Sequence, residues 1–168
     1  TRFFRSDLAR MPYRDPAPSL GWYIPNEDPK ATLLGAEQWR WLEGELDKPV
    51  DLRIIVSSTQ VMTSAHNYEG WTNFPKERAR LYELLDRKKA NDAILLTGDR
   101  HAGGFYRRAV AGKNKLQWEL TSSSLNFAFG RGDNSEREPD PMRTGGFWSI
   151  PNFGQIDIDW DARKVTLS

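Results

Sequence analysis

The segment PKERARLYELLDRKKANDAILLTGDRHAGGF, residues 75–105, decides the fold class of the chain. Its first half predicts a helix, because proline suits the first helical turn and Leu81, Leu84 and Leu85 share one helical face. Its second half starts with the apolar run at residues 93–97, which predicts a short strand. That strand ends abruptly in a Gly-Asp-Arg-His cluster, and so polar an ending raises the question of function.

A second apolar run lies upstream, in DLRIIVSSTQ at residues 51–60. The β-branched residues Ile54, Ile55 and Val56 predict a short buried strand that ends in hydroxyl and amide side chains. Strand, helix and strand in this order form a βαβ unit. Such a unit implies parallel strands joined by a right-handed crossover.

The part of the chain before this unit divides into two segments. Residues 1–31 are rich in proline and turn residues, and we expect an irregular segment there. An amphipathic helix is predicted over about residues 36–47, because Trp39, Leu42 and Leu46 recur at helical spacing.

After the βαβ unit the pattern changes to antiparallel β. Residues 105–124 predict two strands around an Ala-Gly-Lys-Asn turn. Residues 130–146 predict a charged loop, rich in glycine and proline, of the kind that covers a site. Residues 153–168 predict a closing hairpin that turns at residues 161–164. We therefore expect an α/β fold, with residues 1–168 forming one domain or half of a larger one.

Composition excludes several classes of protein. Lys and Arg number 24 against 23 Asp and Glu, so the net charge of +1 gives no electrostatic argument for nucleic acid. The absence of cysteine excludes disulfides and thiolate metal sites. No apolar run approaches the roughly 18–20 residues that span a bilayer, so no membrane span is expected. The chain starts with Thr1 rather than Met, and we expect it to be part of something longer.

The ends of the two predicted strands are the candidate functional site, because ligands of α/β sheets bind beyond the carboxyl ends of strands. The first strand ends in the hydroxyl and amide side chains of residues 57–60, and the second ends in Asp99, Arg100 and His101. A carboxylate and an imidazole two residues apart suit a zinc- or iron-type cation. The alternative is that His101 is a partly buried histidine bonded to Asp99.

Six segments of the chain, in this order, carry a resemblance to a known family: LLGAEQWRWLEGEL, SSTQV, HNYEGWTNFPKERARLYELL, ILLTGDRHAGG, WELTSSSLN and NFGQIDIDW. Together they resemble the C-terminal half of the alkaline phosphatase D family, a branch of the calcineurin-like metallophosphoesterases. The opening TRFFRS is also similar to the family's stretch before its Leu-Gly-x-x-Gln-Trp helix. Each motif is weak alone, but six in the right order are specific.

The resemblance implies a fold and an activity. The fold is the C-terminal half of a metallophosphoesterase-type four-layer α/β/β/α sandwich, with a binuclear or trinuclear metal site at the strand ends. The activity is hydrolysis of phosphate monoesters or diesters by a metal-bound hydroxide. Iron plus calcium are the implied metals, with zinc or manganese as alternatives. A secreted or periplasmic location is favoured.

The resemblance also assigns the polar cluster that ends the second strand. The family's Gly-Asp-x-His motif falls on Asp99 and His101, which are then metal ligands. His101 would serve the iron-type site and Asp99 the second site, which calcium often occupies. Gly98 is expected to let the backbone turn beside them.

Four further residues are candidates for the site. His66 and Glu69 fall in the family's His-x-x-Glu-x-Trp stretch and are expected to be catalytic, His66 by binding metal or phosphate. Without the resemblance, His66 would be a simple surface residue of a loop. Gln60, at a strand end, and Arg100, at the motif's variable position, are candidate substrate contacts. For Arg100, pairing with surface carboxylates is the alternative.

The superfamily's earlier motifs, which would supply the bridging carboxylate and most other ligands, are absent from these 168 residues. We therefore expect a phosphoester substrate and, as partner, the missing N-terminal half of the same enzyme or a second chain. A sandwich half should also expose an apolar sheet face. Two alternatives stay open. The chain could be a non-catalytic binding module that uses residues 130–146 for a partner, or a structural half that only completes a sandwich.

Overall fold

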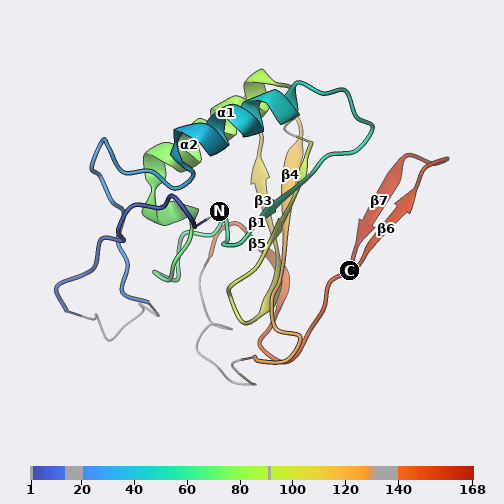
Figure 1. The fold of residues 1–168 in the computed structure, drawn as a ribbon. Helices are drawn as coiled ribbons and strands as arrows, with labels where there is room; N and C mark the ends of the chain where they lie inside the picture. The colour runs from blue at the N-terminus through green and yellow to red at the C-terminus, as the bar shows by residue number, and fades with distance from the viewer. Residues whose placement is uncertain (1, 14–20, 91, 129, 131–139) are drawn as a thin grey trace.

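The computed structural model describes residues 2–13, 21–90, 92–128, 130 and 140–168. They form a mixed β-sheet with two helices on one face and a separate hairpin (Figure 1). In chain order the elements are α1 (Gly35–Leu46), β1 (Ile54–Ser57), the 3-10 helix η1 (Trp71–Asn73), α2 (Pro75–Arg87), β2 (Ile94–Thr97), β3 (Gly103–Ala109), β4 (Leu116–Ser122), β5 (Arg143–Trp148), β6 (Ile156–Asp159) and β7 (Lys164–Leu167).

The five strands of the main sheet lie in the order β1-β2-β4-β3-β5. Strand β2 pairs in parallel with both β1 and β4, whereas β3 pairs antiparallel with β4 and β5. Strands β6 and β7 form the separate hairpin, which extends away from the sheet at the C-terminal end (Figure 1). The predicted βαβ unit, the antiparallel pair after it and the terminal hairpin are all confirmed.

Buried Glu77, in the first turn of α2, holds the start of α1. Its Oε2 accepts hydrogen bonds from the backbone N–H of Leu33 at 3.0 Å and of Leu34 at 3.3 Å. The same oxygen accepts from the Thr32 hydroxyl at 3.0 Å and from the Trp39 indole N–H at 2.7 Å. One carboxylate therefore satisfies amide donors that a helix start leaves without partners, and it ties α1 to α2.

The hydrophobic core lies between these two helices and the sheet, and the buried faces predicted for both helices are confirmed. It is formed by Leu33, Leu34, Trp39, Leu42, Leu46, Val61, Met62, Trp71, Phe74, Leu81, Leu84, Leu85, Ala90, Leu95 and Tyr106. None of the helices in the described residues is long and apolar enough to cross a membrane.

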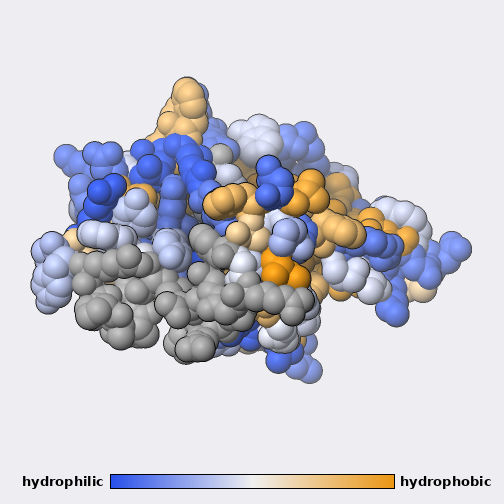
Figure 2. All heavy atoms as spheres, turned by 90° about the horizontal axis from the view of Figure 1, so that it is seen from below, coloured by the Kyte–Doolittle hydropathy of each residue, from blue (hydrophilic) through white to orange (hydrophobic). Residues whose placement is uncertain are grey.

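The opposite face of the sheet is partly open to water. Val56 is 75% exposed, Trp148 44%, Leu116 41% and Ile54 39%. The prediction that β1 is buried is therefore wrong for Ile54 and Val56. Their strand lies at the sheet edge, and alternate residues point away from the helices. Seen from below, hydrophobic side chains gather on the side of the sheet next to the protruding hairpin (Figure 2). An exposed apolar sheet face was expected of a sandwich half.

Strand β5 corrects the prediction of a loop over residues 130–146, because the strand begins at Arg143. It pairs with β3 through a register shift between Gly104 and Phe105, and Gly145 has a φ of +76°. Glycines read as a loop in the sequence, but here tertiary pairing builds a strand from them. Most of the predicted loop lies outside the described residues. The described parts of residues 1–31 are irregular, as predicted.

Candidate active site

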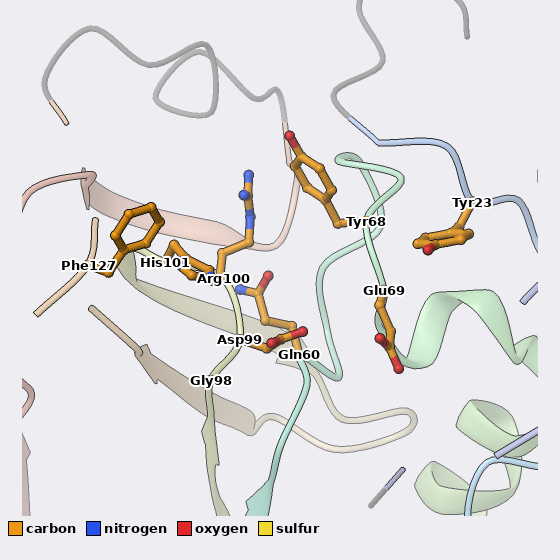
Figure 3. Close-up of a pocket in the computed structure, with 9 residues that line it drawn as sticks. All are labelled: Tyr23, Gln60, Tyr68, Glu69, Gly98, Asp99, Arg100, His101 and Phe127. Atoms are coloured by element: carbon orange, nitrogen blue, oxygen red, sulfur yellow. The ribbon is translucent and has the colours of Figure 1, made fainter. Parts of the chain in front are cut away.

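The parallel strands β1 and β2 end at the same edge of the sheet, and a cavity of about 350 Å³ lies there. It is lined by Tyr23, Gln60, Tyr68, Glu69, Gly98, Asp99, Arg100, His101 and Phe127 (Figure 3). The structure thus brings together five of the six residues predicted for the site. The sixth, His66, is buried behind the cavity, and only 1% of its surface is exposed.

Asp99 and His101 both have left-handed backbone conformations, with φ values of +66° and +54°. Non-glycine residues seldom adopt this region, and such residues cluster at functional sites. Gly98 was expected to provide the turn, and this is wrong. A Cβ at Gly98 would meet only ordinary contacts, the nearest at 3.6 Å from Ser123. The chain turns at the two candidate ligands themselves.

Two arginines of the N-terminal segment neutralise the carboxylates of the site. Arg2 donates to Asp99 through Nη2, and to Glu69 Oε1 through Nε at 3.1 Å. Arg5 Nε lies 3.1 Å from the same Glu69 oxygen. Sequence reasoning missed both arginines, since about seventy residues separate Arg2 from Glu69. Their only signal was the TRFFRS stretch of the family resemblance.

His66 is neutral in the folded chain. Its Nδ1 accepts the backbone N–H of Tyr68 at 2.8 Å, and its Nε2 lies 3.0 Å from Oε1 of Gln60. A carbonyl oxygen can only accept, so Nε2 carries the ring proton. Neither nitrogen is then available to a metal ion or a phosphate. The prediction that His66 is a surface residue is therefore wrong. His66 is linked to the cavity through its hydrogen bond with Gln60, which lines the cavity.

Arg100 is only 4% exposed and so does not lie on the surface. Its guanidinium lies over two aromatic rings, 4.9 Å from the ring centre of Tyr68 and 5.6 Å from that of Phe147. Its backbone N–H donates to the Ser123 hydroxyl at 3.0 Å. These two aromatic rings stabilise the positive charge beside the cavity.

The described residues include side chains of the types that bind metal ions, but they supply fewer ligands than a metal site needs. Asp99 supplies a carboxylate and His101 an imidazole, which suit a zinc- or iron-type ion. Catalytic zinc sites, however, use three protein ligands. No group of three or more His, Cys, Asp or Glu side chains that could hold a metal ion occurs in the described part of the chain. These residues therefore offer an incomplete ligand set.

The burial of His66 predicts a loss of stability in acid. Desolvation, followed by the positive charge of Arg100, lowers the pKa of His66 from 6.5 to about 3. The unfolded chain therefore binds a proton that the folded chain does not. The free energy of unfolding should fall as pH drops from 6.5 towards 3, by up to about 1.4 kcal/mol per pH unit. Glu119 acts in the opposite sense, because burial raises its pKa from 4.5 to about 7. The stability that Glu119 contributes in its protonated form is lost as pH rises through 7.

Urea unfolding of the wild type and of His66→Phe between pH 6.5 and 4.5 separates these effects. The difference in free energy of unfolding, wild type minus variant, should decrease steadily as pH falls, because only the wild type carries the His66 titration. Thr59→Val, at a buried residue that does not titrate, is the matched control and should follow the wild type. A difference that stays constant with pH would show that His66 is not held neutral.

Comparisons with known proteins agree with one another. The family of PhoD-like phosphatases matches residues 1–168. Alkaline phosphatase D of Bacillus subtilis (strain 168) is 28% identical over 134 residues, which are 74% of this chain and 21% of that protein. The solved structure of PhoD has a similar fold, with a TM-score of 0.64 at 21% identity, over 79% of this chain and 30% of that one. The chain thus spans about a fifth of the length of its curated relative.

Proposed function

Because this chain belongs to the PhoD-like phosphatase family, we propose that it supplies part of the metal site of a phosphoester hydrolase. One observation carries the proposal. Asp99 and His101, at the family's Gly-Asp-x-His positions, are both in left-handed conformations at the end of β2 and line one cavity. Strain of this kind at two candidate ligands is what a preorganised site requires.

The roles of the residues follow from their chemistry. His101 would be a ligand of an iron-type ion and Asp99 a ligand of a second ion such as calcium. Such ions, when bound, activate water and neutralise the charge of phosphoryl oxygens. Arg2 and Arg5 form ion pairs with Glu69 and Asp99, carboxylates that line the cavity. Guanidinium groups suit phosphoryl oxygens, so we assign both arginines to the substrate side, with Glu69 holding them in place.

The remaining ligands would come from an upstream segment of the same enzyme. One support for this part of the proposal is that the chain matches only 21% of the length of its curated relative. A second is the open apolar face of the sheet, against which another sheet could pack. A second chain could supply the same groups. Mono- or diester preference, iron plus calcium as the metals and a secreted or periplasmic location belong to this proposal as well. The alternative of a partner bound by residues 130–146 falls mostly on residues outside those that the structure describes.

The 168-residue chain alone is expected not to hydrolyse phosphoesters. Two-metal catalysis needs ions about 3.5–4 Å apart, each held by several ligands, and the chain offers one ligand pair. The test assays purified residues 1–168 on chromogenic phosphomonoesters and phosphodiesters with iron and calcium supplied. The assay is then repeated with the upstream segment of the reading frame added. Metal-dependent turnover should appear only in the mixture.

The matched control is the same mixture prepared with the Asp99→Asn variant in place of the wild-type chain. Its turnover should be lower than that of the wild-type mixture. Turnover by the isolated chain would contradict the shared site. A mixture that binds no metal and shows no turnover would instead favour a binding or structural module.

A further inference from the structure

A continuous relay of hydrogen bonds runs from the rear of the cavity into the layer between sheet and helices. His66 Nε2 lies 3.0 Å from Gln60 Oε1, and Gln60 Nε2 lies 3.0 Å from the Thr121 hydroxyl. The Thr121 hydroxyl lies 2.8 Å from that of Thr97, which lies 2.7 Å from Oε1 of Glu119. All five side chains are buried, each at most 5% exposed.

The sheet itself places the relay. Strands β2 and β4 pair Thr97 with Thr121 and Leu95 with Glu119, so the hydroxyls and the carboxylate stand on one face. That face is the one that α1 and α2 cover, and Gln60 reaches it from the end of β1. Three members of the relay, Thr97, Thr121 and Glu119, therefore stand on neighbouring strands of the sheet, and the connection after β1 brings Gln60 and His66 to them.

Groups with fixed roles hold both ends of the relay. At one end the Tyr68 backbone N–H can only donate, so Nδ1 of His66 accepts and Nε2 carries the proton. At the other end Glu119 accepts the backbone N–H of Val61 at 3.1 Å and of Met62 at 2.7 Å. Above its pKa of about 7 Glu119 is ionised and can only accept from the Thr97 hydroxyl, so the relay is considered in that form. The hydrogen bonds between the two ends can then run in only one direction.

That direction decides which way the Gln60 amide faces. His66 donates to the amide oxygen, so the NH₂ group faces Thr121, whose hydroxyl donates onward to Thr97 and from there to Glu119. Gln60 lines the cavity beside Asp99 and His101 (Figure 3). An amide held in this way needs no reorganisation when a ligand binds.

We propose that Glu119, acting through Thr97 and Thr121, is a positioning residue that fixes the Gln60 amide beside the Nε2–H of His66 at the rear of the site. Its importance for phosphoester binding rests on the proposed function, but the coupling itself does not. Glu119 touches neither the cavity nor the candidate ligands. It also holds the backbone directly after Gln60, so it anchors both the side chain and the main chain of that residue.

The test reads the His66 imidazole by ¹H–¹⁵N NMR in the metal-free chain, which contains two histidines. In the wild type His66 should give a neutral Nε2–H signal that exchanges slowly with water. Thr97→Val keeps the shape of the side chain but removes a hydroxyl that lies two hydrogen bonds from Gln60. It should speed that exchange about tenfold or more, because the Gln60 amide is then less firmly held against Nε2–H. Thr97→Ser restores the hydroxyl and should restore the wild-type signal.

Thr59→Val is the matched control. Thr59 is buried beside Gln60, and its hydroxyl has no hydrogen-bond partner among the described residues, so its loss should leave the His66 signal unchanged. If Thr97→Val does not fold, Thr121→Val serves as the test in its place. An Nε2–H signal of His66 that exchanges as slowly in a folded Thr→Val variant of the relay as in the wild type would overturn the proposal. Because no metal or substrate is present, this outcome is independent of whether the chain belongs to a hydrolase.

Discussion

His101→Ala, made in the mixture of this chain with its upstream segment, should lower phosphoester hydrolysis by about a hundredfold or more. The substitution removes the imidazole from the end of β2, and a ligand lost from a metal site takes both the ion and its chemistry with it. Stability should change little, because His101 is only half-buried and its described ring contact is with the exposed Phe127, at 5.2 Å between ring centres. Turnover, bound metal and melting temperature are measured on the same samples.

Two carboxylate variants complete that experiment. Asp99→Asn keeps the size of the side chain but removes its charge, so the second ion should be lost while the fold remains. Asp157→Asn, at an exposed position on the β6–β7 hairpin, should leave turnover and metal content unchanged. Near wild-type turnover with full metal content in His101→Ala would remove this residue from the site.

Glu77→Ala should cause the largest loss of stability, about 4 kcal/mol in free energy of unfolding. Four donors at the start of α1 converge on one oxygen of this carboxylate. Alanine would leave these groups without an acceptor in an apolar setting, where an unsatisfied donor costs about 1–3 kcal/mol. Chemical unfolding of the 168-residue chain measures the change directly.

A graded pair of variants shows whether the acceptor oxygen is the cause. Glu77→Gln retains one carbonyl oxygen, so it should lose less than half of what alanine loses. Glu83→Ala, on the exposed side of the same helix, should change the free energy of unfolding by less than about 0.5 kcal/mol. Equal effects of Glu77→Ala and Glu83→Ala would show that Glu77 is not the anchor of α1.

The elements that local pattern determines were predictable from the sequence. The leucines of α2 repeat at helical spacing, and β1 and β2 are apolar runs bounded by turn residues. The candidate ligands were also found, because Asp99 and His101 follow a strand directly and the family motif covers them. Prediction succeeded where a few adjacent residues carry the whole signal.

Features that depend on distant partners were not predictable. Strand β5 exists because β3 offers it an edge, and its own glycines argue against a strand. In β4 the polar residues Gln117, Glu119 and Thr121 face the helices, the reverse of the usual rule that polar side chains face water. The burial of His66 and the ion pairs of Arg2 likewise arise from contacts between segments far apart in the sequence, which no local spacing records.

The open face of the sheet decides how these variants should be measured. Fluorescent dyes that report unfolding bind exposed apolar surface, and Val56, Leu116 and Trp148 offer such surface before unfolding begins. In a dye-based melting curve the fluorescence would already be high before unfolding, so the increase at each transition would be too small. Far-UV circular dichroism avoids this error, because it follows α1, α2 and the strands whatever adheres to the sheet. Reversible self-association through the same face would make the apparent melting temperature rise with protein concentration, so the variants need to be compared at one dilute concentration.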